Sequence, residues 1–154
     1  MKNKTAPQPL PELSRPLRAD HVPLGGMKEH IVAAPAERAA LAARFGLEDL
    51  ARLEAFLDID RAQDGMFSVK GRIEAQITQS CVVTLEPVIS EIHEPVRVLF
   101  APPNLVKNKK DGGVSDIAED DDLEPIENGR IDLGELVAQI LAGAIDPYPR
   151  KAGV

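Results

Sequence analysis

Residues 67–78 read Phe67-Ser68-Val69-Lys70-Gly71-Arg72-Ile73-Glu74-Ala75-Gln76-Ile77-Thr78. Apolar residues and glycine alternate with polar residues along this run, which is the period of two that a β-strand with one buried face shows. Residues 50–60 alternate in the same way, and Asp64-Gly65 between the two runs is a turn signal. The two runs therefore predict an antiparallel hairpin.

Outward from this hairpin, two further segments have strand patterns. Residues 88–100 alternate again after the bend that Glu86-Pro87 predicts, and Pro95 within them indicates an edge strand or a bulge. Residues 29–32 predict a short strand after the Gly25-Gly26 turn.

Two helices flank the strands in the sequence. Residues 35–45 begin with proline, are rich in alanine and are followed by Gly46, which suits a helix stop. Asp132 can cap a second helix whose third residue is Glu135, and Pro147 ends it. We expect an α+β fold: an antiparallel β meander with an N-terminal helix and with a C-terminal helix packed on its apolar face.

A chain of 154 residues fits one domain. We expect a flexible proline-rich lead-in over residues 1–16, a single domain over 17–150 and a tail over 151–154. Within the domain, residues 103–125 are expected to form a mobile charged loop. Neither a membrane span nor a signal peptide is predicted, because the apolar runs are too short, so we expect a cytoplasmic protein.

The net charge of −7 is concentrated in one segment. Residues 111–127 carry eight acidic and no basic side chains, and the rest of the chain carries 18 basic and 17 acidic ones. Such a block of like charges is usually solvated. It is also complementary to a basic partner.

Signatures of catalysis and of cofactor binding are missing. The three histidines have no paired metal-ligand spacing, and neither a nucleophile elbow nor a phosphate-binding loop occurs. The acidic run lacks the glycine and the spaced ligands of a calcium loop. Cys81, the single cysteine, is followed by the apolar Val82 and Val83, has no histidine next to it in the sequence, and is expected to be buried and structural. We therefore expect a protein without cofactor that is not an enzyme.

Three blocks of sequence resemble a known family. They are Gln79-Ser80-Cys81-Val82-Val83-Thr84-Leu85-Glu86-Pro87, Ile131-Asp132-Leu133-Gly134-Glu135-Leu136-Val137-Ala138 and Asp146-Pro147-Tyr148-Pro149-Arg150. Together with the helix at 36–41 and Gly71, they are similar to the YceD family, the large ribosomal RNA subunit accumulation proteins of bacteria and plastids, and in particular to its alphaproteobacterial branch. The resemblance runs from about residue 14 to residue 150.

The resemblance implies a role in the synthesis, processing or stability of large-subunit ribosomal RNA, in a protein often encoded beside a small ribosomal protein. Many members have a C-x-x-C pair where this chain has Cys81-Val82-Val83-Thr84, so no thiol-based metal site is expected. The matching motif residues are expected to be structural: Gly71, Cys81, Thr84, Leu85, Glu86, Pro87, Asp132, Glu135, Pro147 and Pro149.

Three mechanisms remain open. An adaptor would hold a basic large-subunit ribosomal protein or a pre-ribosomal particle, with residues 111–127 imitating the charge of RNA. A direct binder of large-subunit ribosomal RNA would use basic side chains on a strand face and in the loop. An RNA-processing enzyme would most simply use Glu86 and Asp132. The candidate contact residues are Lys70, Arg72, Lys107, Lys109, Lys110, Asp120, Asp121, Asp122 and Arg150.

Overall fold

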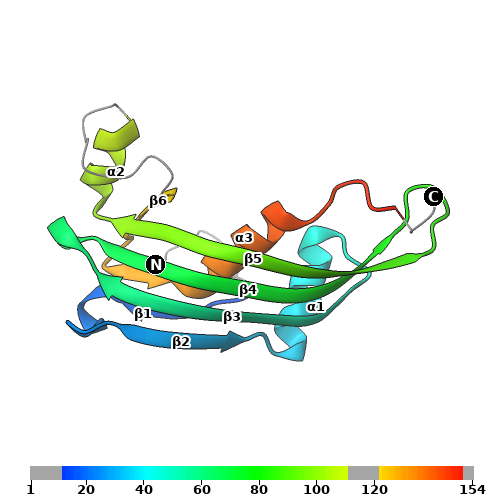
Figure 1. Cartoon of the computed structure of the whole chain (residues 1–154), viewed down its shortest axis with the longest axis horizontal. Coiled ribbons are helices and arrows are strands. Elements are labelled where there is room, and N and C mark those ends of the chain that lie inside the picture. The colour runs from blue at the N-terminus through cyan, green and yellow to red at the C-terminus, as the bar shows by residue number, and fades with distance from the viewer. Residues whose placement is uncertain (1–11, 111–121, 151–154) are drawn as a thin grey trace, which may run out of the picture.

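The computed structural model describes residues 12–110 and 122–150, and for residues 107–110 it describes the backbone alone. A five-stranded sheet forms its main layer (Figure 1). Its strands, in spatial order, are β2 (Met27–Val32), β3 (Asp49–Arg61), β4 (Phe67–Ser80), β5 (Pro87–Ala101) and β6 (Asp122–Pro125). The pairs β2–β3, β3–β4 and β4–β5 are antiparallel, and β6 pairs in parallel with the end of β5.

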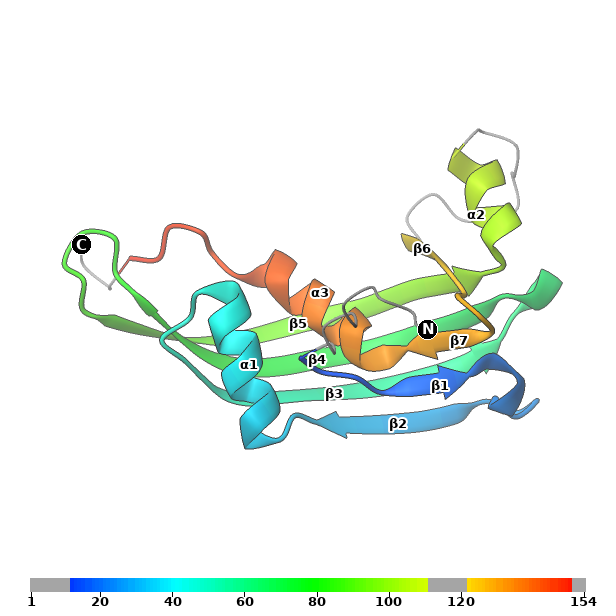
Figure 2. The same ribbon diagram turned by 180° about the vertical axis from the view of Figure 1, so that it is seen from behind.

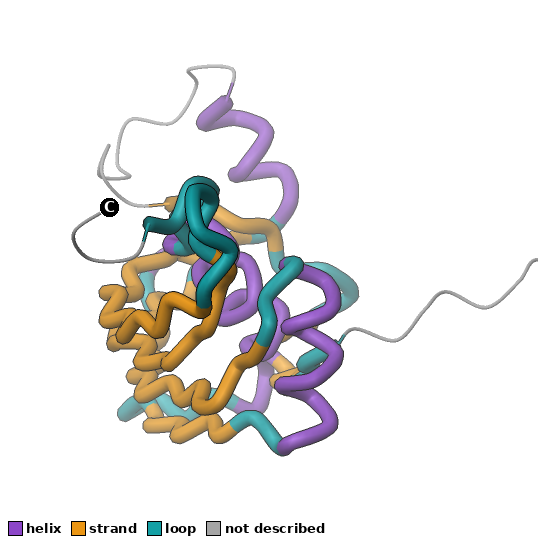
Figure 3. The backbone as a smooth tube through the Cα atoms, turned by 90° about the vertical axis from the view of Figure 1, so that its right-hand side faces the viewer, coloured by secondary structure: helices purple, strands orange, loops and turns teal. Residues whose placement is uncertain are grey.

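One face of this sheet is covered by a second layer (Figure 2). The layer contains α1 (Pro35–Phe45), α3 (Leu133–Ala144) and a two-stranded ribbon of β1 (Pro16–Arg18) and β7 (Arg130–Asp132). The short helix α2 (Pro103–Lys110) projects at one end of the molecule, next to β6 (Figures 1 and 3). Short 3-10 turns at Ala19–His21 and Gln63–Gly65 complete the described elements.

The core lies between the sheet and the second layer. The sheet contributes side chains such as Ile73 and Ile77, and α3 contributes Val137 and Leu141, all at most 1% exposed. Leu13, which precedes β1, is also fully buried in this core. The other face of the sheet is open and carries the polar positions of the alternating strands, as the period of two requires.

The predicted α+β class with a mainly antiparallel sheet is confirmed. α1 spans the residues predicted for it, and Gly46 ends it in the left-handed conformation. The alternating runs form β3, β4 and β5, and Asp132 caps α3. Pro95 lies where β5 is an edge of the sheet, because β6 pairs only with residues 98–101.

Two boundaries differ from the prediction. The segment 103–125 is not a loop at its ends, because α2 occupies residues 103–110 and β6 occupies residues 122–125. Pro103 suits a helix start, and Val106 is buried against Met66 and Ala101. The lead-in is also shorter than predicted, because Leu13 is buried and Pro16 pairs with Asp132. Residues 1–11, 111–121 and 151–154 lie outside the described residues.

Candidate functional site: an acidic furrow beside α3

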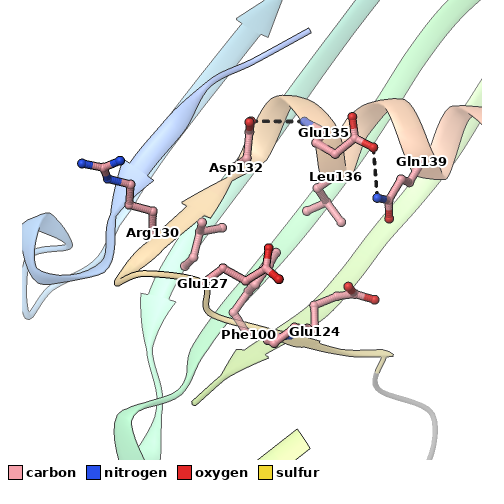
Figure 4. A pocket seen from close by; sticks show the side chains of 10 residues that line it. Phe100, Glu124, Glu127, Arg130, Asp132, Glu135, Leu136 and Gln139 are labelled. Atoms are coloured by element: carbon pink, nitrogen blue, oxygen red, sulfur yellow. Dashed lines mark hydrogen bonds between the residues drawn. The ribbon is translucent and has the colours of Figure 1, made fainter. Parts of the chain in front are cut away.

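A pocket of about 280 Å³ opens between α3 and the β6–β7 segment (Figure 4). Its floor is apolar, since Phe100, Ile131 and Leu136 are at most 7% exposed. Its rim is polar and carries Glu124, Glu127, Arg130, Asp132, Glu135 and Gln139. In Figure 4 the carboxylates of Glu124 and Glu127 point into the space in front of α3, whereas the Arg130 guanidinium points away toward β1.

A second hollow of about 360 Å³ continues this pocket along α3. The two share Glu124, Leu136 and Gln139, so they form one depression, which we name the acidic furrow. One wall is a stripe of α3 with helical spacing: Asp132, Glu135, Leu136, Gln139, Ile140 and Gly143. The other wall comes from β5, β6 and β7.

The furrow has an excess of negative charge. Its acidic side chains are Glu94, Asp122, Glu124, Glu127, Asp132 and Glu135, and its basic ones are Arg97 and Arg130. Within the described part of the chain, no ion pair joins Glu94, Glu124 or Glu127 to a basic side chain. These carboxylates are therefore available to a basic ligand, and the apolar floor can take the hydrophobic part of its side chains.

Asp132 and Glu135 have structural partners. The Asp132 carboxylate accepts hydrogen bonds from the backbone N–H of Gly134 and of Glu135, at 3.0 and 3.2 Å, and thus caps α3. It also accepts bonds from the Ser14 hydroxyl and the Arg15 backbone N–H. Glu135 accepts from Arg44 at the end of α1 and from Gln139. The structural role predicted for Asp132 agrees with these bonds, whereas Glu135 joins α3 to α1 instead of closing a capping box.

A bidentate ion pair fixes the segment that crosses α3. The Arg15 guanidinium donates to both Glu37 oxygens, at 2.7 and 2.9 Å, and Glu37 also accepts from the Ala34 backbone N–H. The hydrogen bond from Arg15 is the main cause that lowers the pKa of Glu37 below its usual range. Residues 14–15, α1 and the start of α3 thereby form one connected unit.

The predicted basic contacts of β4 lie on the open face of the sheet, away from the furrow. Arg72 donates to Glu74 at 2.9 Å and stacks over the Phe56 ring at 4.2 Å, and His30 stacks on the same ring. Lys70 is exposed and lies in the strand register between Asp58 and Arg97. Because Arg72 is already paired with a carboxylate, this face is poorly prepared to bind phosphate.

The remaining predicted contacts are spread over the chain. Asp122 lines the furrow, and Arg150 is exposed near the C-terminal end of the described residues. The backbone of Lys107, Lys109 and Lys110 belongs to α2, and their side chains lie outside the description. Asp120 and Asp121 lie outside the described residues as well.

The family motifs at 79–87 and 146–150 meet at the far end of the β4–β5 hairpin. The Gln79 side-chain amide donates to the Asp146 carbonyl at 2.8 Å, and the Val82 N–H donates to the Pro149 carbonyl at 2.9 Å. Cys81 is fully buried, as predicted. Thr84 accepts from the Glu86 N–H, Pro87 begins β5, and Pro149 is buried whereas Pro147 is exposed. Leu85 is exposed, which a purely structural role does not explain.

Sequence reasoning found part of the furrow. The charge pattern placed Asp122, Glu124 and Glu127 in the acidic segment 111–127 that an adaptor would present to a basic partner. It did not bring these residues together with Glu94 and α3, because their spatial proximity depends on the parallel pairing of β6 with β5. The spacing of Asp132, Glu135, Leu136, Gln139, Ile140 and Gly143 was a second available signal, since it marks a continuous face of α3.

Two kinds of site are absent from the described residues. No group of three or more His, Cys, Asp or Glu side chains there is arranged to hold a metal ion. No helix among them has the length and apolar character needed to cross a bilayer.

Comparison with known proteins gives one match. The model of the family described as "Large ribosomal RNA subunit accumulation protein YceD" matches residues 69–153, which include β4 from Val69 onward, β5, the furrow and the C-terminal motif. No curated protein and no solved structure matches the chain. Since the match covers more than half of the sequence, the chain belongs to the YceD family, whose name ties its members to the accumulation of large-subunit ribosomal RNA.

Proposed function

We propose that this protein supports the accumulation of large-subunit ribosomal RNA without catalysis, as an adaptor that holds a basic ribosomal protein or an assembly intermediate in the acidic furrow. The observation that carries the proposal is the set of furrow carboxylates, Glu94, Glu124 and Glu127, above an apolar floor. Ribosomal proteins bind a polyanion, so their RNA-binding segments carry basic side chains that a row of carboxylates attracts.

The stretch of sequence that directly precedes β6 is acidic as well. Residues 111–121 contain Asp111, Asp116, Glu119, Asp120 and Asp121 and no basic residue. We place the protein in the cytoplasm, where ribosomal subunits assemble, and in the alphaproteobacterial branch of its family.

Direct RNA binding is the competing mechanism. Carboxylates repel phosphate, so the furrow disfavours an RNA strand, and the basic residues of the open sheet face are in part paired with acids. The adaptor mechanism is therefore the better supported of the two.

The test measures capture of large-subunit proteins by the tagged full-length chain. The double variant Glu124→Gln/Glu127→Gln keeps the shape of both side chains and removes two charges. We expect it to bind the captured protein about tenfold more weakly at low salt and to show a smaller loss of affinity as salt rises. Binding is measured after nuclease treatment, by titration of the chain against total protein extracted from purified large subunits.

The matched control is Asp58→Asn/Glu91→Gln, which removes two charges from the open sheet face. Both carboxylates are about half exposed and form surface ion pairs, so this change should barely affect stability. Equal weakening by both double variants would contradict a specific role of the furrow. Capture that disappears with nuclease would favour RNA binding instead.

A further inference from the structure

The far end of the β4–β5 hairpin concentrates exposed apolar side chains. Five of the seven large hydrophobic residues that the described part of the chain leaves exposed lie there, which we name the apolar tip: Val82 (47%), Val83 (57%), Leu85 (76%), Ile89 (67%) and Tyr148 (73%). Single exposed apolar residues are ordinary, but a cluster of them marks an interaction surface.

The apolar tip has a defined conformation. The Cys81 N–H donates to the Glu86 carbonyl at 2.8 Å, and the Leu85 N–H donates to the Cys81 carbonyl at 2.9 Å. The C-terminal segment is held against this turn by the bonds to Pro149 and Asp146 already described. Two segments that are distant in sequence thus build one surface. Because this surface is already ordered in the free protein, binding a partner does not have to include the entropy cost of ordering it.

Leu85 gives the strongest sign that the tip binds something. Its backbone has a φ of 63°, in the left-handed region that glycine and asparagine adopt more readily than leucine. Its side chain is 76% exposed, so it adds little to the core. The left-handed backbone costs the fold free energy, and the exposed leucine side chain contributes little that would offset it. A bound partner that covers the side chain would account for leucine at this position.

The charges around the apolar tip indicate the kind of partner. In the segments 46–49, 80–89 and 145–150, the acidic residues are Glu48, Asp49, Glu86 and Asp146, and the one basic residue is Arg150. Glu48 and Asp49 lie beside the tip, since Glu48 accepts from the Ser80 hydroxyl and Asp49 pairs with Thr78. An acidic border disfavours nucleic acid and favours a basic protein segment.

We propose that the apolar tip is a second contact for the basic protein held in the acidic furrow, and that it binds apolar side chains flanked by lysine or arginine. This inference rests on the proposed function for the identity of the partner. Two separate contacts on one chain raise the affinity for a partner that reaches both, because the second contact forms within the complex.

The decisive variant is Leu85→Asn, with Leu24→Asn as its control. Asparagine accepts the left-handed backbone, so Leu85→Asn should fold at least as stably as the wild type. Leu24 is 91% exposed and lies outside the tip, so the control makes the same chemical change on a different surface. We expect Leu85→Asn to lower the affinity for the protein captured from nuclease-treated total large-subunit protein at least about tenfold, and Leu24→Asn to leave it unchanged. Tyr148→Ser should weaken the same binding.

The outcomes separate the two proposals. If Glu124→Gln/Glu127→Gln loses affinity while Leu85→Asn and Tyr148→Ser bind as tightly as the wild type, the second contact is refuted and the adaptor function stands. If the wild type captures no large-subunit protein, both proposals fail together. A clear loss of stability in Leu85→Asn would overturn the argument that the fold does not need this leucine.

Discussion

At position 71 the backbones of β3 and β4 approach too closely for a side chain. A Cβ on Gly71 would lie 1.8 Å from the carbonyl oxygen of Phe56 and 2.9 Å from its carbonyl carbon. Backbone atoms in the middle of a paired strand cannot move aside cheaply. The sequence marks Gly71 as a family position, but only the register of β3 against β4 shows which atom excludes the methyl group.

We expect Gly71→Ala to destabilise the protein by about 2 kcal/mol or more, because β3 and β4 must separate locally. The control is Gly143→Ala, where a Cβ would meet nothing within 4 Å and alanine should stabilise α3 by about 0.5–1 kcal/mol. Urea unfolding of both variants measures the two free energies. A Gly71→Ala protein as stable as the wild type would show that the strands can relax.

At the scale of the element, the local sequence was sufficient to predict those helices and strands whose bounds depend on residues close together in the chain. Proline and glycine bound α1, the alternation of polarity marks β3 to β5, and Asp132 caps α3. The local sequence did not predict the elements that form only because of a tertiary contact. β6 has four residues and pairs with β5 in parallel, and α2 buries Val106 in a small separate cluster, so neither has a strong pattern of its own.

The cap of α3 also holds the N-terminal segment. We expect Asp132→Ala to lower the free energy of unfolding by about 2 kcal/mol, at the upper end for a helix cap, because the carboxylate also binds Ser14 and Arg15. Asp132→Asn keeps one acceptor oxygen and should recover part of this loss. Thermal unfolding of the two variants tests the ranking, and equal losses would mean that the charge, not the hydrogen bonds, is what matters.

At the scale of the whole molecule, ion pairs within the sheet and within the second layer make the fold sensitive to acid. Hydrogen bonds from arginine are the main cause that lowers the pKa of Glu37 and of Glu74. A backbone hydrogen bond is the main cause that lowers the pKa of Glu12, and a hydrogen bond from Arg44 adds to it. A carboxylate whose pKa is lower in the folded state contributes stability that is present above its unfolded pKa. That contribution is lost as the pH falls through the lower folded pKa.

We therefore expect stability to be nearly constant from pH 7 to about pH 5 and to fall below about pH 5, where glutamate begins to protonate in the unfolded chain. Glu37→Gln should reduce the slope in the acid range, because Glu37 is the partner of Arg15 between the N-terminal segment and α1. Chemical unfolding at a series of pH values measures both curves. An unchanged slope in the variant would assign the acid sensitivity to other carboxylates.

The bond between Ser14 and Asp132 joins residues 118 positions apart in the sequence, and the β1–β7 ribbon is equally non-local. During synthesis the N-terminal segment emerges first, but its partner strand and the α3 turn beneath it emerge after more than a hundred further residues. The β3–β4 and β4–β5 hairpins can pair long before that, since their strands are adjacent in the chain. We therefore expect the N-terminal segment to pack against α3 in the last step of folding. Until that step, Leu13 and the start of α3 remain exposed to solvent in the nascent chain.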